Sequence, residues 1–169
     1  MLRALLARHP GMAAEAERLA KSVVTDVDVE AIAENVEQAV LDLDLDDLNA
    51  RAGRKRWGYV EPTEAAWELL EEAVAPYLDE MRRRIELGLE AAAVAACQAI
   101  VSGLYRCQGR ATDRVIGWAE DSPAEIAGEA VATLARMSAA KHRRIWRLPT
   151  AFKEQVPEWA DLIDRSGRK

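Results

Sequence analysis

The amino-acid sequence predicts an all-α fold, an irregular bundle of about six to eight helices forming a single domain over residues 1–169. Half of the residues are hydrophobic but only 5% are aromatic, and alanine supplies much of the apolar content, which suits closely packed helices. Only residues 41–45 alternate apolar and polar side chains as a strand does. A chain of 169 residues can bury about 70% of its unfolded surface, enough for one core.

The N-terminal part of the chain is predicted to form three helices. The first two are short: Leu2 to Arg8, which Pro10 ends, and Met12 to Val23. The third begins at Thr25, whose hydroxyl can cap the backbone while Asp28 completes a capping box. Valines and an isoleucine then follow at helical spacing, which predicts a buried face on this helix.

An acidic run should end the third helix near Leu41, because negative charge is unfavourable at a helix C-terminus. Its members are Asp42, Asp44, Asp46 and Asp47. They resemble the start of a calcium loop, but Asp47 stands where glycine is needed and Gly53 stands where a bidentate glutamate is needed. We therefore expect no calcium site, and expect these acids to be solvated or paired with Arg51 or Arg54.

A long basic and aromatic loop is predicted at residues 49–62, where two glycines, a proline and three consecutive bases stand without helical periodicity. A helix follows it, with an apolar face of Trp67, Leu70 and Val74. Pro76 interrupts that pattern, so we expect the helix to break or kink sharply there.

The longest apolar stretch, Leu87 to Leu104, predicts a central helix that is buried on most sides. A line of small residues predicts close approach of a neighbouring helix: Gly88, Ala92, Ala96, Ala99 and Gly103. The alanine content and Glu90 indicate a core helix rather than a membrane span. Cys97 is expected in the core, and about 15 Å of helix separates it from Cys107, too far for a disulfide.

The C-terminal part is predicted to contain a second loop, Gly109 to Gly117, and then a helix capped by Ser122. This helix is expected to run on toward Trp146. Pro157 should start a last short segment, and the basic end at residues 166–169 should fray.

No motif for catalysis or metal binding is recognisable in the sequence. The chain has two histidines, no cysteine pair at zinc-ligand spacing, no glycine-rich phosphate loop and no nucleophile elbow. We therefore expect no metal, no cofactor and a non-enzymatic protein. The N-terminal apolar run is too short for a signal peptide, so a cytoplasmic location without membrane association is expected.

Charge is spread unevenly along the chain. The net charge is −6 overall, −7 over residues 1–50 and +5 over residues 136–169, and the overall acidity disfavours a general nucleic-acid binder. Two clusters nevertheless mix bases with aromatic rings that could stack on nucleobases. They are Arg54, Lys55, Arg56, Trp57 and Tyr59 in the first, and Arg143, Arg144 and Trp146 in the second. Each cluster could equally face solvent or pair within the molecule.

Glu90 is the one acid that stands within the long apolar stretch, and it is a candidate functional buried acid. A glutamate there must be paired, neutralised or facing an opening. Exposure at a helix end or in a groove is one interpretation, and a buried partner such as Arg106 or Arg114 is the other.

Successive short helices with Ala and Leu cores and small-residue contacts resemble HEAT-like α-solenoid or irregular helical-bundle proteins. No period of about 40 residues repeats, so this is a likeness of architecture and transfers no functional residue. The leading hypothesis is a helical module that binds another protein or itself, through a helix face. A nucleic-acid-associated regulator that uses the two basic clusters is the alternative. An enzyme would need a pocket around Glu90 or beside Trp57 and Tyr59.

Overall fold

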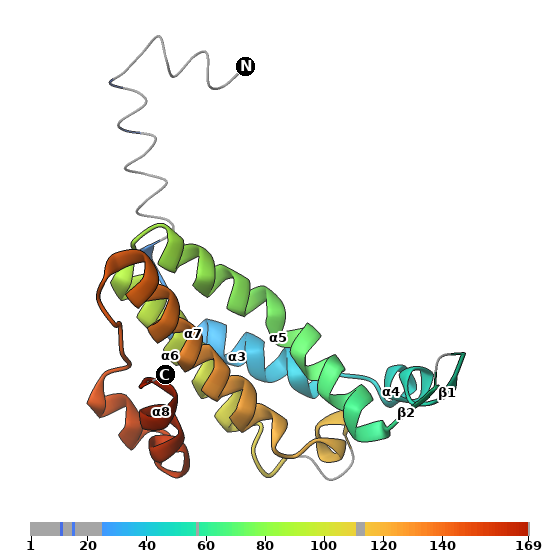
Figure 1. The fold of residues 1–169 in the computed structure, drawn as a ribbon. Helices are drawn as coiled ribbons and strands as arrows, with labels where there is room; N and C mark the ends of the chain where they lie inside the picture. Colours follow the sequence, from blue (N-terminus) through green and yellow to red (C-terminus); the bar gives the residue numbers. More distant parts are fainter. Residues whose placement is uncertain (1–10, 12–14, 16–24, 57, 111–113, 169) are drawn as a thin grey trace.

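Helices dominate the computed structural model of the chain (Figure 1), which describes residues 11, 15, 25–56, 58–110 and 114–168. The helix expected at Leu2 to Arg8 lies outside these residues, as does all of the helix expected at Met12 to Val23 except Glu15. In the described part, six α-helices, three short 3-10 helices and one two-stranded sheet form an all-α multi-helix bundle. The predicted fold class is confirmed, while the likeness to HEAT-like solenoids stays a prediction.

Helix α3, Val29–Leu41, ends where the sequence predicts but begins later. Residues 26–28 are not helical, and the Asp28 carboxylate accepts a hydrogen bond from the Ala31 amide at 3.0 Å. The predicted cap at Thr25 is therefore wrong. Asp28 satisfies a free amide and also places negative charge at the positive end of the helix dipole.

The predicted loop at residues 49–62 is wrong as well. Helix α4, Leu45–Arg51, fills its start, and strands β1, Gly53–Lys55, and β2, Gly58–Val60, pair as an antiparallel hairpin. The acidic run explains α4, because the Asp44 carboxylate accepts a hydrogen bond from the Asp46 amide at 2.8 Å. The aspartates thus start a new helix, where negative charge is favourable, as well as following the previous one.

The sequence predicts a break or a sharp kink at Pro76; helix α5, Pro62–Glu86, continues through this residue, so the break is absent. Pro76 removes one backbone hydrogen bond, to the carbonyl of Glu72. Both residues are exposed, so water can satisfy that carbonyl. Val74 and Met81, on either side of the proline, are fully buried and hold both halves of the helix against the core.

The long apolar stretch does not form one helix from Leu87. Residues 87–89 form a turn in which Gly88 has φ +75°, and helix α6 runs from Glu90 to Arg106. The close approach predicted from the small residues is confirmed at Gly103. A Cβ atom there would lie 2.5 Å from the Ala33 carbonyl oxygen and 2.7 Å from the Val36 Cβ, so only glycine fits against α3.

Helix α7, Ser122–His142, begins and ends earlier than the sequence predicts. Its N-cap position is Asp121, and the hydroxyl of Ser122 is buried without a hydrogen-bond partner. Arg143 adopts a left-handed conformation with φ 54° and ends the helix before Trp146. Short 3-10 helices occur on either side of α7: η1, Val115–Trp118, η2, Thr150–Glu154, and η3, Pro157–Trp159. The segment predicted from Pro157 is confirmed and continues into α8, Ala160–Ser166.

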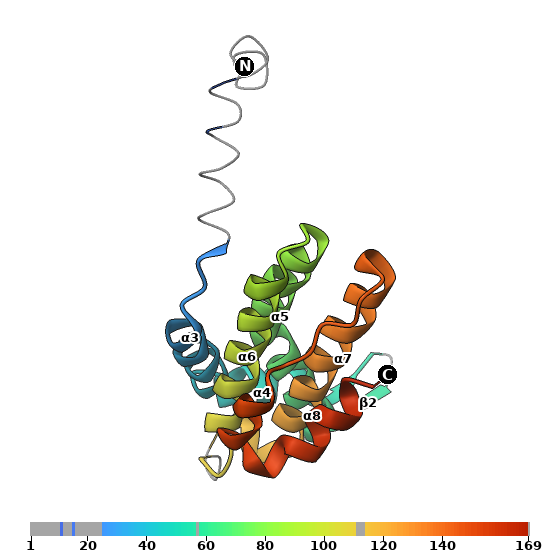
Figure 2. The same ribbon diagram turned by 90° about the vertical axis from the view of Figure 1, so that its left-hand side faces the viewer.

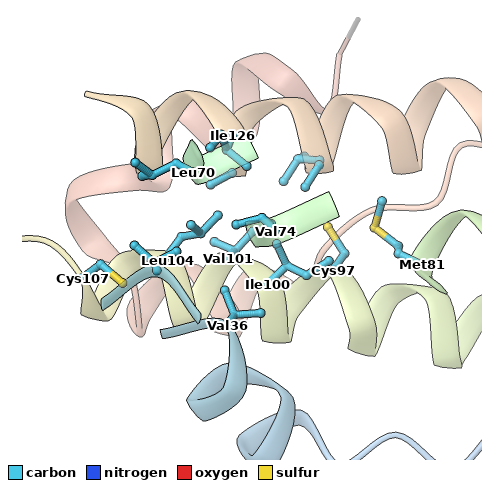
Figure 3. Close-up of a cluster of buried hydrophobic side chains, with 14 of the residues drawn as sticks. Val36, Leu70, Val74, Met81, Cys97, Ile100, Val101, Leu104, Cys107 and Ile126 are labelled. Carbon is cyan, nitrogen blue, oxygen red and sulfur yellow. The ribbon is translucent and has the colours of Figure 1, made fainter. Parts of the chain in front are cut away.

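The helices pack side by side around one apolar core. Helix α6 contacts α3, α5 and α7, while α7 also contacts α5 and α8 (Figure 2). Figure 3 shows core side chains from several helices, among them Val36, Leu70, Val74, Ile100, Val101, Leu104 and Ile126. Cys97 and Cys107 are both free thiols, and Cys97 is buried in the core, as predicted; Cys107 is buried as well. Among the described helices, none has the length and apolar character needed to cross a membrane.

Candidate interaction surfaces

The first basic cluster lies on the β1–β2 hairpin, which Figure 1 shows projecting from the end of the bundle. Arg54 pairs with Tyr59 in the strand register, and both are exposed, with Tyr59 62% exposed. Lys55 is half-buried, and its Nζ donates a hydrogen bond to the Ala50 carbonyl at 2.5 Å. Trp57 lies outside the described residues. The hairpin thus presents Arg54, Arg56 and the Tyr59 ring to solvent.

The base of the hairpin is tied to α5 by Arg51. Its guanidinium donates to both Glu72 carboxylate oxygens, at 2.7 and 2.5 Å, and lies 3.8 Å from Glu68. This hydrogen bond holds the pKa of Glu72 below its usual value. Of the two alternatives for the acidic run, exposure to solvent is confirmed, since all four aspartates are exposed. Arg51 pairs with α5 instead, so it is not part of the free charge of the hairpin.

The second basic cluster pairs within the molecule, at the turn between α5 and α6. Arg144 Nη1 lies 3.3 Å from a Glu90 carboxylate oxygen, and the His142 Nε2 lies 2.7 Å from the Ile85 carbonyl. Trp146 is buried and stacks on the His142 ring at a centroid distance of 4.7 Å. Trp146 is therefore not available to stack on a nucleobase, and of this cluster only Arg143 and Arg144 are exposed.

Glu90 is the first residue of α6, and its side chain is 41% exposed. Of the two interpretations of Glu90, exposure at a helix end is therefore confirmed and burial is wrong, and at this helix start its charge is favourable. Neither expected partner meets it. Arg106 pairs instead with Glu30 at 2.7 Å, and Arg114 donates to the Leu41 carbonyl.

A groove that the sequence does not reveal lies between α5, α7 and α8, with a volume of about 700 Å³. Its floor is apolar, and includes Trp67, Ala75, Leu78, Ile126, Ala132 and Leu162. Its rim carries the charged residues Glu71, Arg82, Glu125, Glu129 and Arg136. We call it the α5–α7 groove. Trp67, predicted on the apolar face of its helix, is only half-buried, because part of its side chain lines this groove.

The charges of the α5–α7 groove are segregated along its length. Helices α5 and α7 run in the same direction, as both ribbon views show, and Glu86 and Lys141 meet at their C-terminal ends at 4.0 Å. Glu71 and Glu125 therefore lie toward one end of the groove, and Arg82 and Arg136 toward the other. Arg82 forms an ion pair with Asp79 on the same helix, at 2.8 Å.

Glu129 belongs to the basic end of the groove, and Arg136 neutralises it. The two side chains form an ion pair at 2.9 Å, and this hydrogen bond, with the nearby charge of Arg82, holds the pKa of Glu129 below its usual value. Glu71 and Glu125 form no ion pair with any described residue. The acids at the other end are thus left without a basic partner in the described part of the chain.

Within the described ranges, no three His, Cys, Asp or Glu side chains are placed to hold a metal ion. Two surfaces stand out among the described residues: the hairpin, with its exposed bases, and the α5–α7 groove, with an apolar floor, unpaired acids at one end and ion-paired arginines at the other. No family model, curated protein or solved structure matches the chain.

Proposed function

We propose that the chain is a non-enzymatic helical interaction module that associates with a second copy of itself through the α5–α7 groove. The observation that carries this proposal is the arrangement of charged side chains along the groove. Glu71 and Glu125, which form no ion pair with a described residue, lie at one end. Arg82 and Arg136, which pair with Asp79 and Glu129, lie at the other. A surface of this kind is complementary to itself when one copy is turned end over end.

The symmetry of a dimer explains why segregated charge favours self-association. In a two-fold dimer the same patch is used twice, so a contact from residue i of one copy to residue j of the other is repeated from residue j to residue i. An antiparallel arrangement of the two grooves places the acidic end of each copy against the basic end of its partner. Such complementarity fixes the register and speeds association.

The floor of the groove supplies the apolar contact that charges alone do not. Trp67, Leu78 and Leu162 are all half-buried, so part of each side chain faces the groove. Stable interfaces bury about 800 Å² per partner around a central aromatic or aliphatic cluster. Helices α5 and α7, with 25 and 21 residues, provide walls long enough for such an area.

The proposal is tested by Leu78→Asp in the middle of the groove, with sedimentation equilibrium as the measurement. The unmodified chain should form dimers, and the variant should dissociate at least about tenfold more readily, because a charge is then buried at the interface. Leu87→Asp is the matched control, since Leu87 is 56% exposed in the α5–α6 turn and outside the groove. A monomer at every concentration of the unmodified chain rejects self-association.

A second candidate function, binding of nucleic acid, is favoured by the hairpin alone. Arg54 and Arg56 form no ion pair with the described residues, and the exposed Tyr59 ring lies opposite Arg54 and can stack on a base. Replacement of Arg54, Arg56 and Tyr59 by alanine should then abolish a salt-sensitive mobility shift with single-stranded DNA or RNA. Absence of any shift with the unmodified chain rejects this candidate.

A cytoplasmic location is also proposed. Its support is that Cys97 and Cys107 are both free thiols, as is usual for proteins kept in a reducing compartment.

A further inference from the structure

A second cavity, of about 310 Å³, lies on the other side of α8 from the α5–α7 groove, and we call it the C-terminal cavity. Its walls are α7, residues 147–150, η2 and α8. Figure 2 shows α8 lying against α7. Val131, Leu148 and Ile163 line it, and each is less than 10% exposed. The cavity therefore has an apolar floor that belongs to the core.

The mouth of the C-terminal cavity is positively charged. Arg147, Lys153 and Arg168 line it, together with one carboxylate, Asp164, and the hydroxyl-bearing Thr150. Three cations against one anion give a local excess of positive charge in a chain whose net charge is −6. Such an excess in a cleft with low-dielectric walls concentrates anions.

Asp164 accounts for only part of this positive charge. Its carboxylate accepts a hydrogen bond from Lys153, which, with the charges of Lys153, Arg168 and Arg147, holds the pKa of Asp164 below its usual value. Arg168 is oriented by a hydrogen bond from its Nε to the Asp164 backbone carbonyl at 2.9 Å, which leaves its terminal nitrogens for another acceptor. Arg147 is exposed and forms no ion pair with the described residues.

We propose that the C-terminal cavity binds a small organic anion, with its charged group held by Arg147 and Arg168 and its apolar body against Val131, Leu148 and Ile163. Small-molecule sites are concave and mostly apolar, with a few placed polar groups, and their volumes begin at about 300 Å³. A guanidinium binds a carboxylate through two parallel hydrogen bonds.

This proposal is independent of self-association. Leu162 and Ser166 of α8 line the α5–α7 groove, whereas Ile163 and Asp164 of the same helix line the C-terminal cavity. The two surfaces share no lining residue.

The test uses octanoate as the probe and octanamide as its uncharged analogue, titrated into the whole chain and followed by NMR of the backbone amides. Octanoate should bind saturably and shift the amides of Val131, Ile163 and Gly167, which line the cavity. Octanamide should bind at least about tenfold more weakly, because it offers no charge to the two arginines.

The variant that tests the site combines Arg147→Gln with Arg168→Gln, and it should weaken octanoate binding at least about tenfold. The matched control combines Arg54→Gln with Arg165→Gln. It removes the same number of charges, one on the hairpin and one on α8, and neither residue lines the cavity. The affinity of this control variant for octanoate should stay within about twofold of that of the unmodified chain. Non-saturable octanoate binding, equal binding of octanamide, or equal loss in both variants overturns the proposal.

Discussion

Gly103 sets the distance between α3 and α6. The nearest atom to a Cβ at this position is a backbone oxygen, which cannot rotate away as a side chain can. Gly103→Ala should therefore destabilise the protein by about 1–3 kcal/mol, even though alanine favours a helix by about 1 kcal/mol over glycine. Ser102→Ala, at the half-exposed neighbouring position, is the control for the effect of alanine on helix propensity alone. Urea unfolding measures both, and a stabilised Gly103→Ala variant would show that α3 and α6 are not in such close contact.

The two thiols are expected to be chemically inert in the folded state. Burial raises the pKa of both Cys97 and Cys107 to about 12, so little thiolate exists at pH 8. A thiol reagent such as 5,5′-dithiobis(2-nitrobenzoic acid) should react with neither native cysteine and with both after unfolding. The folded pKa lies above the unfolded value, so this burial also predicts loss of stability as the pH rises from about 9 toward 12. Rapid reaction of the native protein contradicts this account of Cys97 and Cys107.

Helix α3 offers a direct test of its capping residue. Asp28→Ala should lower the free energy of unfolding by about 1 kcal/mol, because the Ala31 amide then loses its acceptor. Asp26→Ala is the matched control, since Asp26 is an exposed carboxylate two residues earlier and outside the helix. Equal effects of the two substitutions would mean that general charge near the helix start matters and the cap does not.

Helix α5 should become more stable when its internal proline is replaced. Pro76→Ala restores a backbone N–H donor in mid-helix, which stabilises the folded state. The unfolded chain also gains conformational freedom, which offsets part of this effect. We expect the free energy of unfolding to rise by about 1–2 kcal/mol. Thermal unfolding monitored by circular dichroism measures it. A less stable variant would instead show that the core requires the local geometry that Pro76 imposes on α5.

Elements with strong local signals were predictable, and elements that depend on tertiary contacts were not. The periodic valines of α3 and the proline that precedes the last helix are local signals, and both elements form. The continuity of α5 through Pro76 depends on burial of Val74 and Met81, which only the assembled core provides. The hairpin likewise follows a helix whose Arg51 reaches across to Glu72 of α5, a contact between residues 21 positions apart.

At the scale of the whole molecule, ion pairs join elements that are distant in the sequence. Arg106 of α6 lowers the pKa of Glu30 on α3, and Arg51 of α4 lowers the pKa of Glu72 on α5. A carboxyl whose folded pKa lies below its unfolded value of about 4.5 contributes stability above that pH and loses it as the pH falls further. The unfolding temperature should therefore decrease as the pH drops below about 4.5. The decrease should be smaller in the Arg51→Gln variant, which lacks the Arg51–Glu72 pair. Identical acid profiles for the two proteins would contradict a role for this pair.

The candidate surfaces were only partly predictable. The exposed bases of the hairpin, Arg54 and Arg56, could be recognised in the sequence as a basic cluster. Both are exposed, as the nucleic-acid hypothesis requires. The α5–α7 groove is not visible, because Glu71 and Glu125 come from helices far apart in the chain and meet only through parallel packing. Trp146 shows the reverse case, in which a ring among bases is buried by stacking on His142.

Mixing two charge-reversed variants tests the self-association of the α5–α7 groove most directly. Glu71→Lys with Glu125→Lys makes both ends basic, and Arg82→Glu with Arg136→Glu makes both ends acidic. Sedimentation of each variant alone should show monomers, because like charges then face each other across the two-fold axis. An equimolar mixture should form a heterodimer that dissociates as salt is added. A mixture that stays monomeric, or variants that dimerise as well as the unmodified chain, would contradict the proposed interface.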